Sequence, residues 1–402
     1  MAPTLERSRP PWSAWRTVVA FGVVSLFADM VYEGMRSVAG PLLGSLGASA
    51  AVVGLVTGAG EALALVLRLA AGPWADRTGG HWRATFVGYA LTAVCVPLLA
   101  VTPFVGAAGL GLASTLMLLE RTGKAVRSPS KSALLAGVAQ QVGRGRGFAV
   151  HKALDQVGAL LGPLVVAALV ATTDLTWPAF LALALPGALA MVLLVQLRRR
   201  APAGPPAAGP GPDVATVAVS TARLPRSFYL MATGVSASTF ALMTFGVISF
   251  HLVEAGLLSL VTVPLLYAAA MAVEAVAALG TGWAYDHVGA RVLLLLPPAA
   301  AVVAPLSLST TLGTAVAGVL VWGAATGVQD STVKAWVADL VPRERLGTGY
   351  GVFAAFQGAA ALAGGTVAGV LYAEHLVALV ALVAGLQVGA LALLWRALHP
   401  RR

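Results

Sequence analysis

The sequence has few charged residues. Only 10% of its 402 residues are Asp, Glu, Lys or Arg and 58% are hydrophobic, whereas a soluble globular domain carries about a quarter charged residues. The single cysteine, Cys95, excludes a disulfide scaffold and a thiolate metal site. No nucleophile elbow, phosphate-binding Gly-Lys loop or His-rich metal spacing occurs, which disfavours an enzyme. The composition therefore predicts an integral membrane protein that is not an enzyme and needs no cofactor.

Long apolar runs predict roughly twelve membrane-spanning helices, because about 20 residues cross a bilayer at about 1.5 Å per residue. The start, "MAPTLERSRPPWSAW", is polar and no small-residue cleavage site follows it, which argues against a removed signal peptide. The expected spans are residues 16–44, 50–73, 83–102, 106–134, 147–171, 176–197, 227–253, 259–282, 291–309, 311–339, 348–371 and 376–397.

The positions of the cations predict the orientation of the chain. Arginines fall at the termini and in every second loop, whereas intervening loops such as "GSLGASA" and "ATTDLTW" carry none. By the positive-inside rule, we expect a multi-pass protein of the plasma (inner) membrane with both termini in the cytoplasm. The net charge of +10 is then a consequence of topology, and nucleic acid is not an expected partner.

The longest polar interruption divides the chain into two halves. Residues 198–226 are rich in Pro, Gly and Ala, and we expect them to form a flexible cytoplasmic linker. Six expected helices precede the linker, in residues 1–197, and six follow it, in residues 227–402. The predicted domains are therefore two six-helix bundles.

The two halves also share sequence. "GRGFAVHKALDQVGALLGP" aligns with "GTGYGVFAAFQGAAALAGG", which places Asp155 on Gln357 and Gly162 on Gly364. Homologous halves in parallel orientation are typical of membrane transporters built from repeats. The predicted fold is an all-α membrane protein with two pseudo-symmetric six-helix bundles.

A second pair of matching segments, one in each half, resembles a loop of a known family. "GPWADRTGG" (72–80) aligns with "GWAYDHVGA" (282–290), and both resemble the Gly-x-x-x-Asp-Arg-x-Gly loop of the major facilitator superfamily. In the second copy His287 replaces the arginine. The resemblance covers essentially the whole chain and implies a major facilitator fold, in which a monomer moves a small-molecule substrate across the lipid bilayer by alternating access.

In that family these loops gate the conformational change. The gating residues implied here are Asp76, Arg77, Gly79, Asp286 and Gly289. From the residues alone, a carboxylate at this position either caps a helix N-terminus or pairs with an arginine.

The helix expected at 106–134 has a charged face. Its uncharged part, "GAAGLGLASTLMLL", makes about 21 Å of helix, which is short of a hydrocarbon core of about 30 Å. The helix must therefore continue through Glu120, Arg121, Lys124 and Arg127, which fall within an arc of about 120°. Each charge facing lipid would cost roughly 2.5–3.5 kcal/mol, so this face predicts a water-filled cavity. In the alternative, Arg127 and Lys131 extend to the membrane interface.

Carboxylates occur on other helices of the first half. Asp29, Glu33 and Arg36 share one helix face, Glu61 shares another with Arg68, and Asp155 follows Lys152. Pairing with cations would leave one or two carboxylates free to titrate. We therefore predict proton coupling by Asp29, Glu33, Glu61 or Asp155, with Asp29 as the best candidate because it lies near mid-membrane.

Two further expectations concern the polar residues. In the alternative to proton coupling, the charges of the first half form a static salt-bridge network that holds the helices together. The second half is poorer in charge, with an isolated Glu274 and an expected ion pair between Asp330 and Lys334, one helical turn apart.

The segment "DQVGALLGPLVVA" contains Gly158, Gly162 and Pro163, which permit close helix packing and a bend. It resembles the Gly-x-x-x-Gly-Pro element of proton-driven drug antiporters within the superfamily. The same spacing is also common in helices that only pack closely.

Three functions remain open at this level. The first is proton-coupled efflux of small amphipathic molecules. The second is transport of an organic acid or organophosphate, bound by cations through charge-assisted hydrogen bonds. The third is export of a divalent cation on Asp29 and Asp155. The candidate substrate-binding residues are Arg36, Glu120, Arg121, Lys124 and Arg127.

The predicted topology can be tested by cysteine labelling. In a Cys95→Ser background, a Gly209→Cys substitution in the linker should react with an impermeant maleimide only after the cells are opened, because the linker is expected in the cytoplasm. Labelling of intact cells from outside would overturn the orientation.

Overall fold

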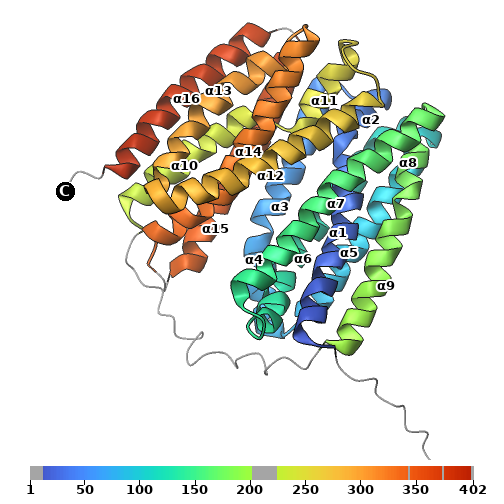
Figure 1. Ribbon diagram of the computed structural model, residues 1–402. Helices are drawn as coiled ribbons and strands as arrows, with labels where there is room; N and C mark the ends of the chain where they lie inside the picture. The colour runs from blue at the N-terminus through green and yellow to red at the C-terminus, as the bar shows by residue number, and fades with distance from the viewer. Residues whose placement is uncertain (1–11, 202–223, 343–344, 374, 400–402) are drawn as a thin grey trace, which may run out of the picture.

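The computed structural model describes residues 12–201, 224–342, 345–373 and 375–399 (Figure 1). These residues are mostly helical and include no β-strand. Residues 202–223, most of the predicted linker, lie outside the described part of the chain.

The first half ends with α9, whose last residue is Arg200. Its helices are α1 (Ala14–Ser37), α2 (Ala39–Ser45), α3 (Ala50–Val66), α4 (Arg68–Thr78), α5 (His81–Leu98), η1 (Leu99–Phe104), η2 (Gly106–Ala108), α6 (Gly109–Ala139), α7 (Arg144–Thr173), α8 (Trp177–Ala182) and α9 (Ala184–Arg200).

The second half starts with α10 at Arg226. Its helices are α10 (Arg226–Leu242), α11 (Phe245–Glu254), α12 (Thr262–Val288), η4 (Gly289–Leu295), α13 (Leu296–Ser307), α14 (Leu312–Leu340), α15 (Leu346–Tyr372) and α16 (Leu376–Leu398).

Ten helical stretches in the described residues are long and apolar enough to cross a membrane. α6 is not among them, because its charges lower its hydropathy, and one stretch, Thr262–Ser307, contains both α12 and α13. Adding α6 and separating α12 from α13 gives the twelve predicted spans. The helix expected at 227–253 is interrupted, since α10 ends at Leu242 and α11 starts at Phe245.

The repeat seen in the sequence has a structural counterpart. Gly162 of α7 packs against the backbone of Met30 in α1, and its repeat partner Gly364 of α15 packs against the backbone of Phe240 in α10. Both glycines face the first helix of their own half, where a side chain would collide with backbone atoms. The two halves therefore use the same close helix contact.

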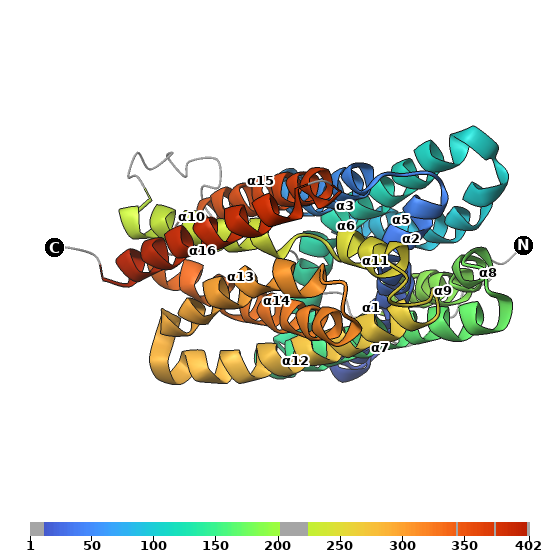
Figure 2. The same ribbon diagram turned by 90° about the horizontal axis from the view of Figure 1, so that it is seen from above.

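The halves meet along two lines. α3 runs beside α15, and α7 runs beside α12 (Figure 2). Glycines permit this contact too, because Gly54 and Gly58 of α3 lie against Gly365 and Ala361 of α15. A third contact joins α2 to α11, where Gly40 faces the backbone of Gly246. A central space is left between the two halves, bordered by α1, α6, α10 and α14 among others.

The glycines of α7 provide a stability test. Gly162→Ala places a methyl group against the Met30 carbonyl, and overpacking of this kind typically costs about 1–3 kcal/mol. We expect a lower melting temperature for the purified variant in detergent. Gly111→Ala is the matched control, because nothing lies within 4 Å of its added Cβ atom and alanine is the better helix former. Equal melting temperatures for the two variants would contradict a packing role for Gly162.

Candidate functional site

A cavity of about 380 Å³ lies between the two halves. Fourteen of its 29 lining residues are charged, so it is suited to a hydrophilic occupant. The cationic residues are Arg36, Arg68, Arg121, Lys124, Arg127, Lys131, Lys152 and Lys334, and the acidic residues are Asp29, Glu33, Glu61, Asp155, Glu274 and Asp330.

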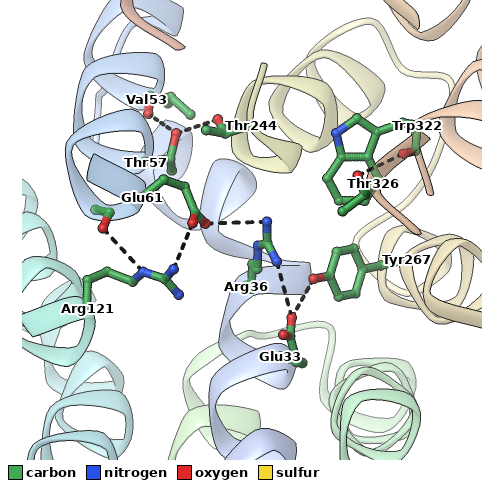
Figure 3. A network of polar contacts seen from close by, with 11 residues as sticks. Glu33, Arg36, Val53, Thr57, Glu61, Arg121, Thr244, Tyr267, Trp322 and Thr326 are labelled. Atoms are coloured by element: carbon green, nitrogen blue, oxygen red, sulfur yellow. Dashed lines mark hydrogen bonds and ion pairs between the residues drawn. The ribbon is translucent and has the colours of Figure 1, made fainter. Parts of the chain in front are cut away.

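A chain of ion pairs runs along the wall that the first half contributes to the cavity (Figure 3). Arg36 of α1 lies between two carboxylates, with Nη1 3.7 Å from Glu33 Oε2 and Nη2 3.4 Å from Glu61 Oε1. Arg121 of α6 donates from Nη2 to Glu61 Oε2 over 2.8 Å. Glu33 and Glu61, two of the predicted coupling residues, are therefore engaged with arginines, as the static-network alternative requires.

Asp29 and Asp155 form a different arrangement. The packing of α7 on α1 brings their carboxyl groups within hydrogen-bonding reach of each other. Lys152 Nζ lies 3.5 Å from Asp155 Oδ2, whereas no cation of the described residues lies within 4.0 Å of Asp29. Gly158, one turn after Asp155, lies against the backbone of Leu26, one turn before Asp29. The Gly158–Gly162 packing thus positions this acid pair.

The charged face predicted on α6 is divided between two environments. Arg121 and Lys124 line the cavity, but Glu120 does not. Glu120 is fully buried, where it accepts a hydrogen bond from Thr92 Oγ1 of α5 over 2.9 Å and lies 3.7 Å from Arg127 Nη1. On a helical wheel, Glu120 and Arg127 occupy one edge of the 120° arc, and that edge faces α5.

Arg127 and Lys131 do not extend away from the helix bundle, as the interfacial alternative had predicted. Arg127 is buried and donates to Thr92 Oγ1 and to the Gly88 carbonyl. Lys131 lines the cavity and donates from Nζ to Ser25 Oγ over 2.9 Å. Within the described residues the expected ion pair between Asp330 and Lys334 is also absent, although both line the cavity.

The predicted gating residues lie at helix ends, outside the cavity. Gly79 and Gly289 end α4 and α12 with φ of 62° and 65°, a conformation that favours glycine. Asp76 is exposed, and its Oδ1 lies 3.5 Å from His81 Nε2. Arg77 and Asp286 are exposed as well. The N-cap of α5 is Gly80, without a side-chain hydrogen bond, and among the described residues Asp76 has His81 and no arginine as an ion-pair partner. Within that part of the chain, neither the capping nor the arginine pairing expected for Asp76 occurs.

Two hydrogen bonds between the halves were not anticipated from the sequence. Tyr267 of α12 donates to Glu33 Oε2 over 2.5 Å, and Thr57 and Thr244 share a hydrogen bond of 2.6 Å between their hydroxyl oxygens (Figure 3). Thr244 lies at the break between α10 and α11, next to Met243, whose φ of 43° is strained for a residue with a side chain. The only sequence signal for this contact is a threonine two residues before a glycine, "TFG", in an apolar span.

These hydrogen bonds close one end of the cavity. Glu33 and Arg121 near them are buried, whereas Lys152 and Lys334, which line the other end, are exposed. That open end lies toward the start of α7 and the end of α14. We call it the linker side, because α9 ends and α10 begins there (Figure 1). The structure thus has a cavity that is closed on one side of the membrane and accessible from the other.

A bundle of apolar helices in two repeats, with a charged cavity open to one side, defines a transporter of small solutes and not an enzyme. Residues 21–322 and 262–402 match the profile of the Major Facilitator Superfamily, and the chain belongs to this family. It is similar to an uncharacterized protein of Mycobacterium tuberculosis, with 47% identity over 398 residues that cover 98% of this chain and 96% of the relative. A Mycobacterium bovis protein, also uncharacterized, matches equally well.

Solved structures support the fold. A POT family transporter in complex with 5-aminolevulinic acid superimposes with a TM-score of 0.75 at 13% identity, covering 96% of this chain and 97% of the other. The nucleoside transporter NupG gives a TM-score of 0.70 at 13% identity, with 96% and 100% covered. A D-xylose-proton symporter gives 0.69 at 16% identity, with 96% of each chain covered. At these identities the likeness shows the fold alone.

The contact between Tyr267 and Glu33 can be tested by a minimal change. Tyr267→Phe removes a hydrogen bond to a charged group, worth about 1.5–3 kcal/mol, and should shift the balance toward a conformation open at the Thr244 end about tenfold or more. Spin labels at Ser49 and Ala255, exposed at that end of each half, would report a longer distance. Tyr285→Phe is the matched control, because Tyr285 bonds Asp339 within the second half. An unchanged distance distribution in Tyr267→Phe would contradict the role of this contact.

Proposed function

We propose that this chain is a proton-coupled transporter of a small hydrophilic solute, with Asp29 and Asp155 as the coupling pair. The observation that supports the proposal is the contact between these two carboxyl groups at the wall of a cavity open to water. Two carboxyl groups at hydrogen-bonding distance do not both ionise, so the pair holds one proton. A change in the packing of α1 against α7 would separate them and release it.

The cations around the pair support exchange of that proton. Lys152 is at 3.5 Å from Asp155, and Lys131, bonded to Ser25, lines the same part of the cavity. When the carboxyl pair loses its proton, these ammonium groups can neutralise the second charge. Glu33 and Glu61 are poorer candidates, since each already faces an arginine.

The cavity lining favours a hydrophilic solute over the amphipathic molecule expected first. The charged half of the lining would have to be desolvated by an apolar ligand, at a large cost. An organic acid or organophosphate, the second sequence hypothesis, matches the excess of cations over carboxylates. A divalent cation has less support, because in the described part of the chain no three His, Cys, Asp or Glu side chains come together as a metal site.

Direction and location complete the proposal. If the protein lies in the inner membrane with both termini in the cytoplasm, the linker side is cytoplasmic and the cavity opens to the cytoplasm. The Gly158, Gly162 and Pro163 element, which resembles that of proton-driven antiporters, supports export of the solute against entering protons. The protein would act as a monomer, since one chain encloses the cavity.

The coupling pair can be tested in proteoliposomes that contain a pH-sensitive dye. A panel of organic acids, organic phosphates and amphipathic cations is added, and the internal pH and the solute uptake are followed. For a transported solute, Asp29→Asn should abolish uptake driven by a pH gradient but retain exchange of labelled for unlabelled solute, because exchange moves no net proton.

Asp174→Asn is the matched control. Asp174 is an exposed carboxylate outside the cavity with φ of 54°, a conformation that asparagine tolerates. Gradient-driven uptake by Asp29→Asn at the wild-type rate would refute Asp29 as the coupling group. If only amphipathic cations are transported, the proposal of a hydrophilic solute is refuted.

A further inference from the structure

We infer that Arg68, Arg121 and Lys124 form the binding site for an anionic group, phosphate or carboxylate, of the transported solute. The inference rests on the proposed function in one respect, namely that the solute enters the central cavity. Arg68 was not among the substrate-binding residues predicted from the sequence, and Arg36 and Arg127 now have other partners.

The three cations come from two adjacent helices and face one space. Arg68 starts α4, and Arg121 and Lys124 lie three residues apart on α6, which places them on neighbouring parts of one helix face. All three line the cavity. Arg121 lies near enough to Arg68 and Lys124 for their like charges to repel, so the three form one positive region.

Two donors of this group have no hydrogen-bond partner among the described residues. Arg121 is only 7% exposed, and while Nη2 bonds Glu61 and Nε bonds the Gly60 carbonyl, Nη1 has no hydrogen-bond acceptor. Arg68 Nε is buried and also lacks an acceptor. A buried donor of a charged group that is left unsatisfied is costly, which favours an acceptor that enters from the cavity.

Of these three cations, only Arg121 makes a direct ion pair with a carboxylate of the described residues. Glu61 is shared between Arg121 and Arg36, and among the described residues no carboxylate lies within 4.0 Å of Arg68 or Lys124. Lys124 Nζ instead lies 3.7 Å from the centre of the Tyr32 ring. An aromatic face attracts a cation without neutralising it, so the ammonium group stays available to an anion.

The geometry suits an anion with two or more acceptor oxygens. A guanidinium presents a planar fork of donors that matches carboxylate and phosphate, and an ammonium adds a point charge. The opposite wall carries Glu274 and Asp330, which would repel the same group. The anionic end of the solute is therefore held on the first half of the chain.

The test measures binding without any pH gradient. Purified protein in nanodiscs of phosphatidylcholine is melted with inorganic phosphate, succinate, glycerol 3-phosphate or glycerol, because a ligand of the folded state raises the melting temperature. We expect stabilisation by at least one of the anions and none by glycerol. Arg68→Gln and Lys124→Gln should each weaken that anion's affinity about tenfold or more.

Arg83→Gln is the matched control, since it removes one exposed cation of α5 that does not line the cavity, and its affinity should stay within about twofold of wild type. A second arm replaces phosphatidylcholine by phosphatidylglycerol. Suppose that phosphatidylglycerol alone stabilises the protein and that Arg68→Gln abolishes this effect. The anion site would then exist but bind a lipid headgroup, and the proposal that it binds the transported solute would be overturned.

No stabilisation by any anion or by phosphatidylglycerol, or equal affinities in wild type, Arg68→Gln and Lys124→Gln, would overturn the site. The result is separable from proton coupling, because anion binding is measured on the wild type without a pH gradient, whereas coupling is measured by gradient-driven uptake. Loss of coupling with intact anion binding, or the reverse, therefore identifies which of the two proposals fails.

Discussion

A charged side chain within an apolar helix needs either an opposite charge or water, because exposure to lipid costs several kcal/mol. This constraint organises the first half of the chain. α6 carries its charges on an arc too wide for one environment, so Glu120 and Arg127 pair against α5 while Arg121 and Lys124 turn to the cavity. The charges that are not paired inside the first half require contact with water, and the hydrophilic space between the halves provides it.

Close backbone contact is the second requirement, because charges on different helices meet only if the helices approach. Gly158 and Gly162 let α7 lie on α1, and Asp155 thereby reaches Asp29. Gly54 and Gly365 likewise allow close packing of α3 on α15, which joins the two halves. Small residues at these crossings give van der Waals contact where lipid offers no hydrophobic drive. The same glycines thus serve both packing and the position of the acid pair.

The fold was largely predictable from the sequence, and the site only in part. Apolar runs, the linker and the glycine repeat follow from local patterns, and they predicted the twelve spans. Single-helix geometry also predicted that Arg121 and Lys124 line a cavity, as they do. It could not show which edge of the α6 arc meets α5, nor that Tyr267 reaches Glu33, because both depend on how separate helices pack. Arg68 was visible as a charge, but the sequence could not show that it forms no ion pair with any other described residue.

The ion-pair chain connects the proposed anion site to the closed end of the cavity. Arg121 bonds Glu61, Glu61 faces Arg36, and Arg36 faces Glu33. Glu33 in turn accepts the hydrogen bond of Tyr267 from the other half. If an anion binds Arg121 as proposed, it would compete with Glu61 for the guanidinium. Glu61 would then hold Arg36 more strongly and draw it from Glu33. Occupation of the site would in this way be coupled to the contact that closes the far side, because a bound solute shifts the balance between two states only by the difference in its contacts with them.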